Sequence, residues 1–360
     1  MSDAHVSRRV RAWEQLIAQA PNASALLVTS LANVRYLTGF TGSNAVLLLE
    51  ESAALLGTDG RYTVQAGEQC PDLPVHLDRV TLPAVAEIWK RRSRGALAVE
   101  AVHLSVGDLR TLEEVLGASP LETSGIVEAC RVHKDAEEIA LIARACAVSD
   151  AALEAILPRV REGITEREVA RWLEAEMFAR GADELSFETI VAGGPNSAKP
   201  HHEPSMRPLE RGDLLLIDFG AAVGGYHADE TRTFIVGEAA DWQREIHTIV
   251  AEAQAAGRDK ACAGAELLDV DTAARSVVAA AGYGDYFDHG LGHGVGLQIH
   301  EAPFFSPRST GKLLAGSPVT IEPGIYLPGR GGVRIEDTIL VGEGPSRSLT
   351  SSPRDLVALG

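Results

Sequence analysis

The stretch LLLIDFG, residues 214–220, places an acidic residue at the end of an apolar run. Acidic residues occur in three further strand-like stretches: DETRT (229–233), TIEPG (320–324) and VRIED (333–337). An unpaired carboxylate buried in a strand costs several kcal/mol, so it is neutralised by a proton, a salt bridge or a cation. Several such groups, with the histidines of GLGHGVGLQIH (290–300) between them in the sequence, indicate a metal site.

A first hairpin is expected around the first two stretches. Strands are predicted at residues 213–222 and 226–236, joined at a Gly-Gly pair suited to the positive φ angles of a tight turn. If the turn centres on that pair, Asp218 faces Thr231, and Asp229 lies on the same face as Thr231. Such diagonal neighbours are about 7–8 Å apart, so both carboxylates reach one metal site.

A second hairpin is expected around the loop 329–332. Glu322 and Glu336 are equidistant from Gly329, the start of this loop, so they should pair across the strands. Period-two alternation places Arg334 on the face of Glu336. We therefore expect Arg334 to support the ligands and to take part in catalysis, the alternative being a salt-bridged strand residue.

The candidate ligands form an oxygen-rich set of four carboxylates and one imidazole: Asp218, Asp229, His293, Glu322 and Glu336. Their combined charge is too negative for one divalent ion and matches two ions that share a hydroxide. Such a set suits Mn, Co, Fe or Zn rather than a thiolate site. Two metal ions lower the pKa of a shared water from 15.7 towards about 7 and polarise a carbonyl group, which is hydrolytic chemistry.

The motifs resemble one protein family. DFG, DETRT, GHGVG with a histidine seven residues later, EPGIY and VRIED are similar, over residues 126–345, to the Xaa-Pro branch of the pita-bread dinuclear metallopeptidases, which contains aminopeptidase P and prolidase. NVRYLTGFTGSNAVLLLE (33–50) and GTDGRYT (57–63) resemble the creatinase-type domain that precedes it. The resemblance implies an α+β fold, with a creatinase-like α/β domain at 1–125 and a pita-bread catalytic domain at 126–360.

The resemblance also implies a role for each ligand. Asp218 would bind one metal in bidentate fashion, His293 and Glu322 would complete the other, and Asp229 and Glu336 would bridge both. The cofactors are then two divalent ions per chain, Mn, Co or Zn.

Further roles follow from the same resemblance. Glu322 would also move the proton, while His201, His289 and His300 would hold the scissile carbonyl, stabilise the tetrahedral intermediate and help the proline nitrogen to leave. His201 is chosen over the adjacent His202 because it directly follows a proline, as in the family pattern.

Other histidines have a simpler interpretation. We expect His202, His227 and His247 to be hydrogen-bonded core residues. The histidines at 289, 293 and 300 differ because glycines surround them, which indicates backbone that closely approaches another group. These glycines match neither GxGxxG nor GxxxxGK[ST], so no phosphate site is predicted.

Composition limits the remaining possibilities. A chain of 360 residues with 45% hydrophobic residues is long enough for two domains with buried cores. The formal charge of −17 argues against nucleic acid or an anionic membrane as a partner. Four dispersed cysteines without CxxC, no apolar run of membrane-spanning length and no signal-peptide core predict a cytoplasmic protein. We expect a homodimer that acts on proline-containing peptides.

The spacing of apolar residues along the chain predicts where strands and helices form. Strand-like runs occur in the first domain, and in the second a pair of helices precedes each hairpin, which suggests two similar halves with the metals between them. Thr165 with Glu168 is a capping-box signature. The expected strands are 25–29, 45–49 and 97–99, and the expected helices are 134–157, 165 to about 181, 241–263 and 266–281.

Alternatives remain at the level of function. A binding protein on the same fold would be expected to have lost ligands, a metal-free creatinase-like hydrolase would not need them, and methionine aminopeptidase lacks the N-terminal domain. Prolidase is preferred over aminopeptidase P, which acts on longer peptides, because Arg35 could bind the free carboxylate of a dipeptide. The alternative for Arg35 is a side chain that extends from a strand end to solvent or pairs with a surface acid.

Overall fold

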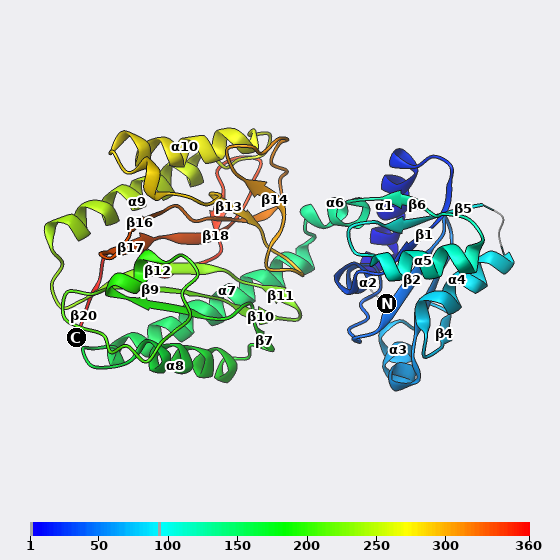
Figure 1. The fold of residues 1–360 in the computed structure, drawn as a ribbon, viewed down its shortest axis with the longest axis horizontal. Helices are drawn as coiled ribbons and strands as arrows, with labels where there is room; N and C mark the ends of the chain where they lie inside the picture. Colours follow the sequence, from blue (N-terminus) through cyan, green and yellow to red (C-terminus); the bar gives the residue numbers. More distant parts are fainter. Residues whose placement is uncertain (1–2, 93–94) are drawn as a thin grey trace. The chain divides into compact units, whose positions relative to one another are not determined.

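The computed structural model describes residues 3–92 and 95–360, and the chain divides into two compact units, Met1–Arg131 and Val132–Gly360 (Figure 1). Both units combine helices with sheets, so the predicted α+β class is confirmed. None of the helices in the described residues is long and apolar enough to cross a membrane.

The division between the units falls later in the chain than the expected joint at 123–125. Helix α6 (Ile126–Val132) follows that joint, and its contacts explain the difference. The Arg131 guanidinium donates to Asn33 Oδ1 (2.7 Å), and the Tyr36 hydroxyl donates to a backbone carbonyl of α6 (2.9 Å). These hydrogen bonds hold α6 in the first unit.

The first unit contains a six-stranded mixed sheet in the order β4-β3-β2-β1-β5-β6. Its strands are β1 (Ala23–Val28), β2 (Ala45–Leu49), β3 (Ala54–Thr58), β4 (Val75–Leu77), β5 (Ala96–Glu100) and β6 (Leu121–Thr123). Its other helices are α1 (Asp3–Gln19), α2 (Leu31–Thr38), α3 (Thr63–Gln69), α4 (Thr81–Arg92) and α5 (Val106–Leu116). The three predicted strands correspond to β1, β2 and β5.

The second unit contains two pairs of long helices, as the sequence predicts: α7 (Ala136–Ile156), α8 (Glu166–Ala179), α9 (Asp241–Lys260) and α10 (Leu267–Ala280). The capping box before α8 is confirmed, because the Thr165 hydroxyl accepts from the Glu168 amide while the Glu168 carboxylate accepts from the Thr165 amide. These bonds satisfy two donors that a helix start leaves without partners.

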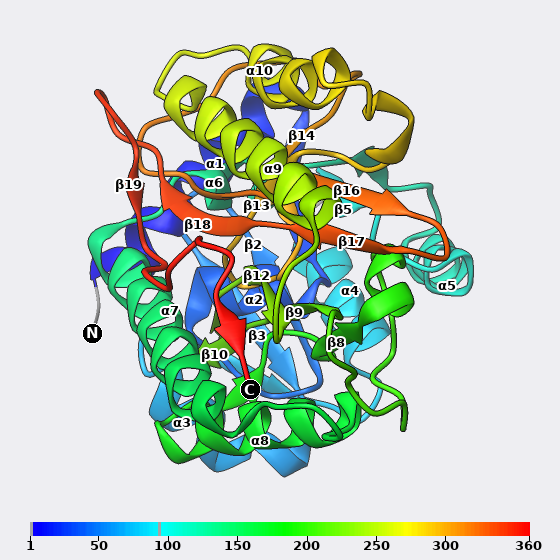
Figure 2. The same ribbon diagram turned by 90° about the vertical axis from the view of Figure 1, so that its left-hand side faces the viewer.

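A nine-stranded sheet forms the centre of this unit, with seven strands in the order β14-β13-β15-β18-β12-β9-β8, β19 paired with β18 and β20 paired with β12. Apolar residues of α7 and α8 pack with those of β9 to β12, and apolar residues of α9 and α10 pack with those of β13 to β18. Figures 1 and 2 show one helix pair on each side of the strands. The strands are β7 (Glu184–Leu185), β8 (Ile190–Gly193), β9 (Leu214–Phe219), β10 (Ala221–Val223), β11 (Tyr226–His227), β12 (Glu230–Val236), β13 (Gly292–Gly294), β14 (Glu301–Phe305), β15 (Pro318–Ile321), β16 (Gly324–Leu327), β17 (Gly331–Arg334), β18 (Glu336–Leu340), β19 (Arg347–Ser348) and β20 (Ala358–Leu359).

The first predicted hairpin is interrupted. Instead of continuous strands over 213–222 and 226–236, β9 and β12 pair with each other, while β10 and β11 join β7 in a separate small sheet. At Gly220, where the chain changes sheet, a Cβ atom would lie 1.9 Å from the carbonyl oxygen of Ala228, so only glycine fits. The Gly-Gly turn itself has φ angles of 60° and 78°, as predicted.

The second hairpin keeps one register through two ladders. Ile321 lies opposite Asp337 in the ladder of β15 and β18, and the pairing continues in step between β16 and β17. This register places Glu322 across from Glu336, as their spacing predicts.

Candidate metal centre

Three neighbouring strands bring polar side chains into one row. Thr231 of β12 lies opposite Asp218 of β9 on one side and opposite Glu336 of β18 on the other. Asp229 is two residues before Thr231, so its side chain leaves the chain on the same face. The sheet register therefore gathers three of the predicted ligands.

His293 in β13 turns one ring nitrogen toward the carboxylates. Its Nε2 atom is 3.4 Å from Asp229 Oδ2 and 3.5 Å from Glu322 Oε1. Its Nδ1 atom is 3.0 Å from the carbonyl oxygen of Gly294, which can only accept a hydrogen bond. In the neutral ring the proton is therefore on Nδ1, and the lone pair of Nε2 faces the carboxylates, as in a metal ligand.

The donor atoms have the properties of a cation site. One ligand atom each of Asp229, His293 and Glu336 lies within 4.8 Å of the others. Asp218 Oδ1 and Glu336 Oε1 are buried and form no hydrogen bond within the described residues. Buried oxygens without partners are rare and costly, so these two atoms fit the role of metal ligands.

The acid–base properties point the same way. Burial and then neighbouring carboxylates raise the pKa of Glu336 well above its ordinary value, and burial raises the pKa of Asp229 to about 6 and that of Glu322 to about 7. Burial lowers the pKa of His293, but Asp229 and Glu322 outweigh it and raise that pKa to about 9. Without a metal, the cluster retains protons to balance its negative charge, and divalent cations would replace them.

Arg334 and Thr231 support these carboxylates. Arg334 Nη2 donates to Asp218 Oδ2 (2.5 Å), and its Nε donates to Thr231 Oγ1 (3.0 Å). Thr231 Oγ1 in turn donates to Glu336 Oε2 (2.7 Å). Asp218 and Glu336 each keep one oxygen free of these bonds, and those are the two buried oxygens without partners.

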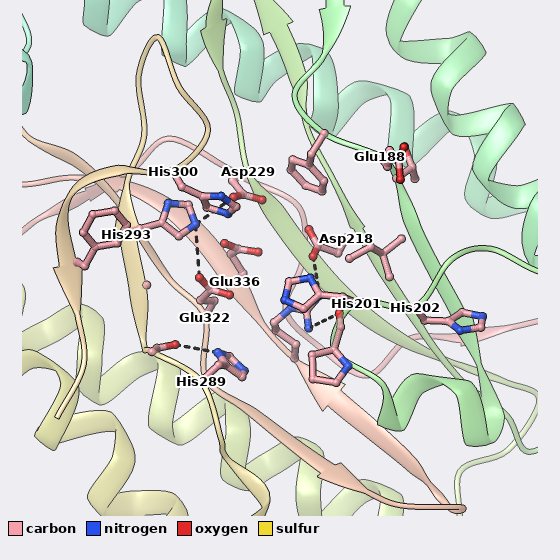
Figure 3. A pocket seen from close by; sticks show the side chains of 18 of the residues that line it. Glu188, His201, His202, Asp218, Asp229, His289, His293, His300, Glu322 and Glu336 are labelled. Atoms are coloured by element: carbon pink, nitrogen blue, oxygen red, sulfur yellow. Dashed lines mark hydrogen bonds and ion pairs between the residues drawn. The ribbon is translucent and has the colours of Figure 1, made fainter. Parts of the chain in front are cut away.

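The cluster opens into a cavity of about 670 Å³. In Figure 3, His293, Asp229, Glu322 and Glu336 converge, whereas the side chain of His202 points away from them. The other predicted site residues of this unit also line the cavity: Asp218, Arg334, His201, His289 and His300.

The adjacent histidines differ in their contacts. His202 Nε2 lies 2.9 Å from an oxygen of Glu166, a fully buried carboxylate, whereas His201 is exposed at the cavity wall. His202 and His227 are hydrogen-bonded as expected, the latter to a backbone carbonyl oxygen (2.8 Å). His247 is buried as expected, and its Nε2 atom has no hydrogen-bond partner among the described residues.

His289 is fixed by two hydrogen bonds. Its Nδ1 lies 2.8 Å from the carbonyl oxygen of Gly290, and its Nε2 lies 2.9 Å from the Tyr326 hydroxyl. Arg334 Nη1 donates to the same hydroxyl (2.8 Å). Burial lowers the pKa of His289 to about 4, so this ring is neutral at neutral pH.

His300 lies against a predicted ligand. Its ring meets the ring of His293 edge to face, with 4.4 Å between the centroids, and its side chain is exposed to the cavity. Burial and then the neighbouring His293 lower the pKa of His300. A neutral His300 can accept or donate a hydrogen bond at the cavity wall.

The glycines around these histidines permit close packing. A Cβ atom at Gly292 would lie 2.1 Å from the carbonyl oxygen of Thr320, and one at Gly294 would lie 2.3 Å from that of Ala302. The predicted close approach of the backbone is confirmed, because β13, which carries His293, pairs with β14 on one side and with β15 on the other.

Arg35 lies in the first unit. The stretch NVRY forms part of α2, so the alternative of an arginine at a strand end is wrong, and Arg35 is half-buried there. Asn33 from the same stretch is buried and donates to Glu100 (2.6 Å) and Glu128 (2.7 Å). Asn33, one residue of this motif, therefore has a structural role within the first unit.

Sequence reasoning missed several polar residues near the cavity. Glu166 follows the capping residue of α8, and the capping box drew attention to Glu168 instead. Tyr326 was visible only as the last letter of EPGIY, and Lys134 only as the start of a helix. Glu166 and Lys134 carry no local pattern that reveals their side-chain partners, since those lie more than 25 residues away, and the same holds for Tyr326 and His289.

Comparisons with known proteins agree with this geometry. Residues 140–343 match the model of metallopeptidase family M24, and residues 9–133 match the creatinase/prolidase N-terminal domain. A curated relative from Pyrococcus horikoshii, named Xaa-Pro dipeptidase, is 37% identical over 92% of this chain and 94% of its own.

Solved structures are similar over nearly the whole length. An Xaa-Pro dipeptidase from Bacillus anthracis has a TM-score of 0.95 at 38% identity and covers 99% of this chain and 100% of its own. An X-Pro aminopeptidase from Thermotoga maritima has a TM-score of 0.89 at 36% identity, with coverage of 97% and 99%. The chain therefore belongs to metallopeptidase family M24, with a creatinase/prolidase N-terminal domain ahead of its catalytic domain.

Proposed function

We propose that the protein hydrolyses the bond between any residue and proline in dipeptides, with two divalent ions per chain. The observation that carries this proposal is the set of four carboxylates and one imidazole that lines the cavity, all buried except the half-buried Glu322, with two oxygens that lack partners in the described residues. The oxygen-rich set favours Mn, Co or Zn.

The residues would divide the two ions between them. Asp218 would hold one ion, His293 and Glu322 the other, and Asp229 and Glu336 would bridge both. When bound, the pair of ions would lower the pKa of a shared water towards about 7 and polarise the scissile carbonyl.

The remaining groups would act on the substrate and its protons. Glu322 would accept the proton of the attacking water and return it to the proline nitrogen. His300 and His201, both at the cavity wall, would hold the carbonyl and the tetrahedral intermediate, with His289 as a third contact. Arg334 would keep the carboxylates of Asp218 and, through Thr231, Glu336 in place.

The preference for dipeptides rests on the relatives and on one candidate residue. The relative from Pyrococcus horikoshii and the structure from Bacillus anthracis are named Xaa-Pro dipeptidases. The alternative is an aminopeptidase P that acts on longer peptides, as the name of the Thermotoga maritima structure illustrates. Arg35 is proposed to bind the carboxylate that a dipeptide presents directly after proline.

The test compares kcat/KM for Ala-Pro, Ala-Pro-amide and Ala-Pro-Ala, in the wild type and in Arg35→Ala. We expect the wild type to prefer Ala-Pro and the variant to lose that preference. A wild type that prefers Ala-Pro-Ala overturns the dipeptidase proposal, and an unchanged preference in the variant removes Arg35 from it.

Two further measurements test the reaction itself. Elemental analysis should find two divalent ions per chain. Met-Pro should be cleaved in preference to Met-Ala, which separates the protein from methionine aminopeptidases.

Two properties of the protein outside the site are also proposed. We infer a homodimer that functions in the cytoplasm on proline-containing peptides. Light scattering of the purified protein tests the dimer directly, and a mass of about 38 kDa would indicate a monomer instead.

A further inference from the structure

Two of the cavity histidines share a structural feature. The residue after His201 is His202, whose ring lies 2.9 Å from Glu166, with side chains 10% and 0% exposed. The residue after His300 is Glu301, which lies 2.5 Å from the Lys134 ammonium, with side chains 6% and 1% exposed. Each cavity histidine is therefore followed by a residue in a buried polar pair: a histidine hydrogen-bonded to a carboxylate after His201, and a carboxylate bound to an ammonium group after His300.

Glu166 connects the whole segment around His201 to the start of α8. One of its oxygens accepts from the Gly193 amide (2.8 Å) and from Asn196 (2.9 Å). The other accepts from His202 and from the amide (2.9 Å) and hydroxyl (2.6 Å) of Ser205. These partners lie on both sides of His201 in the chain, so one buried carboxylate fixes both ends of the segment.

Lys134 has the corresponding position beside His300. It precedes α7, and its amide donates to a backbone carbonyl (3.0 Å) in the loop before β15. Its ammonium reaches Glu301 at the start of β14. A Cβ atom at Gly296 would lie 2.3 Å from the same carboxylate, so the loop from 296 to 301 is folded closely around this ion pair.

Neither Glu166 nor Lys134 is among the groups that face the metal ligands. Neither residue lines the cavity, and in Figure 3 the side chain of His202 points away from the carboxylates. A buried ion pair is weak evidence for stability, because desolvation offsets much of the attraction between the charges. Stability alone therefore does not account for the pair of Lys134 and Glu301, nor for the five hydrogen bonds that converge on Glu166.

We propose that Glu166 and Lys134 are positioning residues, Glu166 for His201 and Lys134 for His300. The inference rests on the proposed function, in which these histidines contact the substrate. Each pair fixes the residue next to a histidine whose own ring must remain exposed to the substrate. The ring thus reaches the cavity from a backbone that cannot shift.

Double-mutant cycles in kcat/KM for Ala-Pro test this assignment. Glu166→Gln and Lys134→Met should each lower kcat/KM about 10- to 100-fold, mainly in kcat, since a displacement of about 1 Å can cost that much. Glu166→Gln should have no further effect in a His201→Ala background, and Lys134→Met none in a His300→Ala background. In the crossed combinations the fold-losses in kcat/KM should multiply, because the two residues act on different histidines. These combinations are Glu166→Gln with His300→Ala and Lys134→Met with His201→Ala.

Controls separate positioning from general damage. Lys312→Met removes a lysine from an exposed pair with Glu266 (3.4 Å) and should leave kcat/KM unchanged. Lys134→Arg keeps the charge and should recover most of the activity lost in Lys134→Met. If Glu166→Gln or Lys134→Met fails to fold, His202→Gln and Glu301→Gln break the same pairs from the loop side and enter the same cycles.

Amide hydrogen exchange tests the anchors independently of activity. Glu166→Gln should increase exchange in 196–206 but not in 296–303, and Lys134→Met should do the reverse. Multiplicative effects in the matched cycles, or increased exchange throughout the unit, would show general destabilisation and overturn the proposal. A wild type that does not cleave Ala-Pro overturns the proposed function instead, while the exchange experiment still decides whether the anchors act locally.

Discussion

Glu336 and Asp337 are neighbours on β18, yet their surroundings differ completely. Glu336 faces the cavity, where burial and then the nearby carboxylates raise its pKa well above the ordinary value. Asp337 faces the other side of the sheet. Burial alone would raise its pKa, but Arg232 and Arg354 outweigh burial and lower it.

The difference lies in where the positive charge comes from. Asp337 accepts hydrogen bonds from Arg232 (2.8 Å), Gln254 (2.6 Å), Thr350 (2.9 Å) and Arg354 (2.5 Å). On that face the chain supplies its own cations. On the cavity face Arg334 cannot balance four carboxylates, so the sheet needs cations from solution. Buried acids thus identify a metal site only after the partners supplied by the protein are counted.

Glu230 is the exception on the Asp337 side. One of its oxygens lies 3.0 Å from the Arg232 guanidinium, yet burial raises its pKa to about 8. Arg232 also donates one hydrogen bond to Asp337 and several to backbone carbonyl oxygens, so its charge is not reserved for Glu230.

The strongest test removes a carboxylate from the cavity face. Glu336→Ala should lower kcat/KM by on the order of 10⁴-fold or more, because the proposed bridging ligand has no substitute. Elemental analysis of the same variant should show less than two ions per chain. Glu188→Ala, which removes an exposed carboxylate from the cavity wall, should keep both ions. A fully active Glu336→Ala variant would contradict the two-metal mechanism.

The matching change on the other face should act on stability. Asp337→Ala leaves Arg232 buried with one carboxylate fewer, and removing one partner of such a pair costs about 3–5 kcal/mol. Urea unfolding measures this loss, and the folded variant should still bind both ions. Glu343→Ala at an exposed position provides the reference, with a change of about 0.5 kcal/mol or less. Loss of metal from folded Asp337→Ala would remove the distinction between the two faces.

His300 offers a substitution on the cavity face that spares the ligands. We expect His300→Ala to lower kcat about 100-fold and to change KM by about threefold or less, since the proposed contact strengthens in the transition state. Steady-state kinetics with Ala-Pro separates the two parameters, and metal content should be unchanged. A rise in KM alone would assign His300 to substrate binding.

Removing the metals should make stability depend on pH. The pKa of Asp229 is raised to about 6 and that of Glu322 to about 7, so the folded state holds protons that the unfolded chain has already released. Stability of the metal-free protein should therefore fall as pH rises from about 4 to about 7. His293, with a pKa of about 9, adds stability below its unfolded value of about 6.5 that is lost as pH rises towards 9.

The measurement is thermal unfolding after chelation, at pH 5.5 and pH 8. We expect the metal-free protein to be about 3–5 kcal/mol more stable at pH 5.5, an effect that Glu336→Gln should reduce and added metal should reverse. Equal stability at both pH values would mean that the carboxylates are already balanced by protein groups.

The sequence predicted the cavity face better than the other face. Acidic residues in apolar runs, read with a period of two, placed Asp218 opposite Thr231 and Glu322 across from Glu336, because strand pairing converts sequence spacing directly into distance. The same alternation shows that Arg232 and Asp337 point away from the cavity. It does not show that they meet, since they come from different strands and their further partners lie elsewhere in the chain.

The remaining differences have similar causes. The break in the first hairpin depends on a contact between Gly220 and the carbonyl oxygen of Ala228, which no local preference reveals. The alternative interpretation of Arg35 assumed a strand end, but the stretch forms helix α2, which has Ser30 as its N-cap residue and ends before a glycine in the left-handed conformation. Both features depend on contacts between residues or on helix caps, which the periodicity of apolar residues does not describe.

The hydrogen bonds of Asp337 also have a consequence for the order of events during synthesis. Its partners Thr350 and Arg354 leave the ribosome after it, and β20, which pairs with β12, follows still later. A nascent chain that ends near residue 340 already contains every proposed metal ligand but lacks two of the four side chains that bind Asp337 on the opposite side of that sheet. Domains generally fold as units. The sheet that carries the ligands should therefore be complete, and able to bind both ions, only after residues 350–359 have left the ribosome.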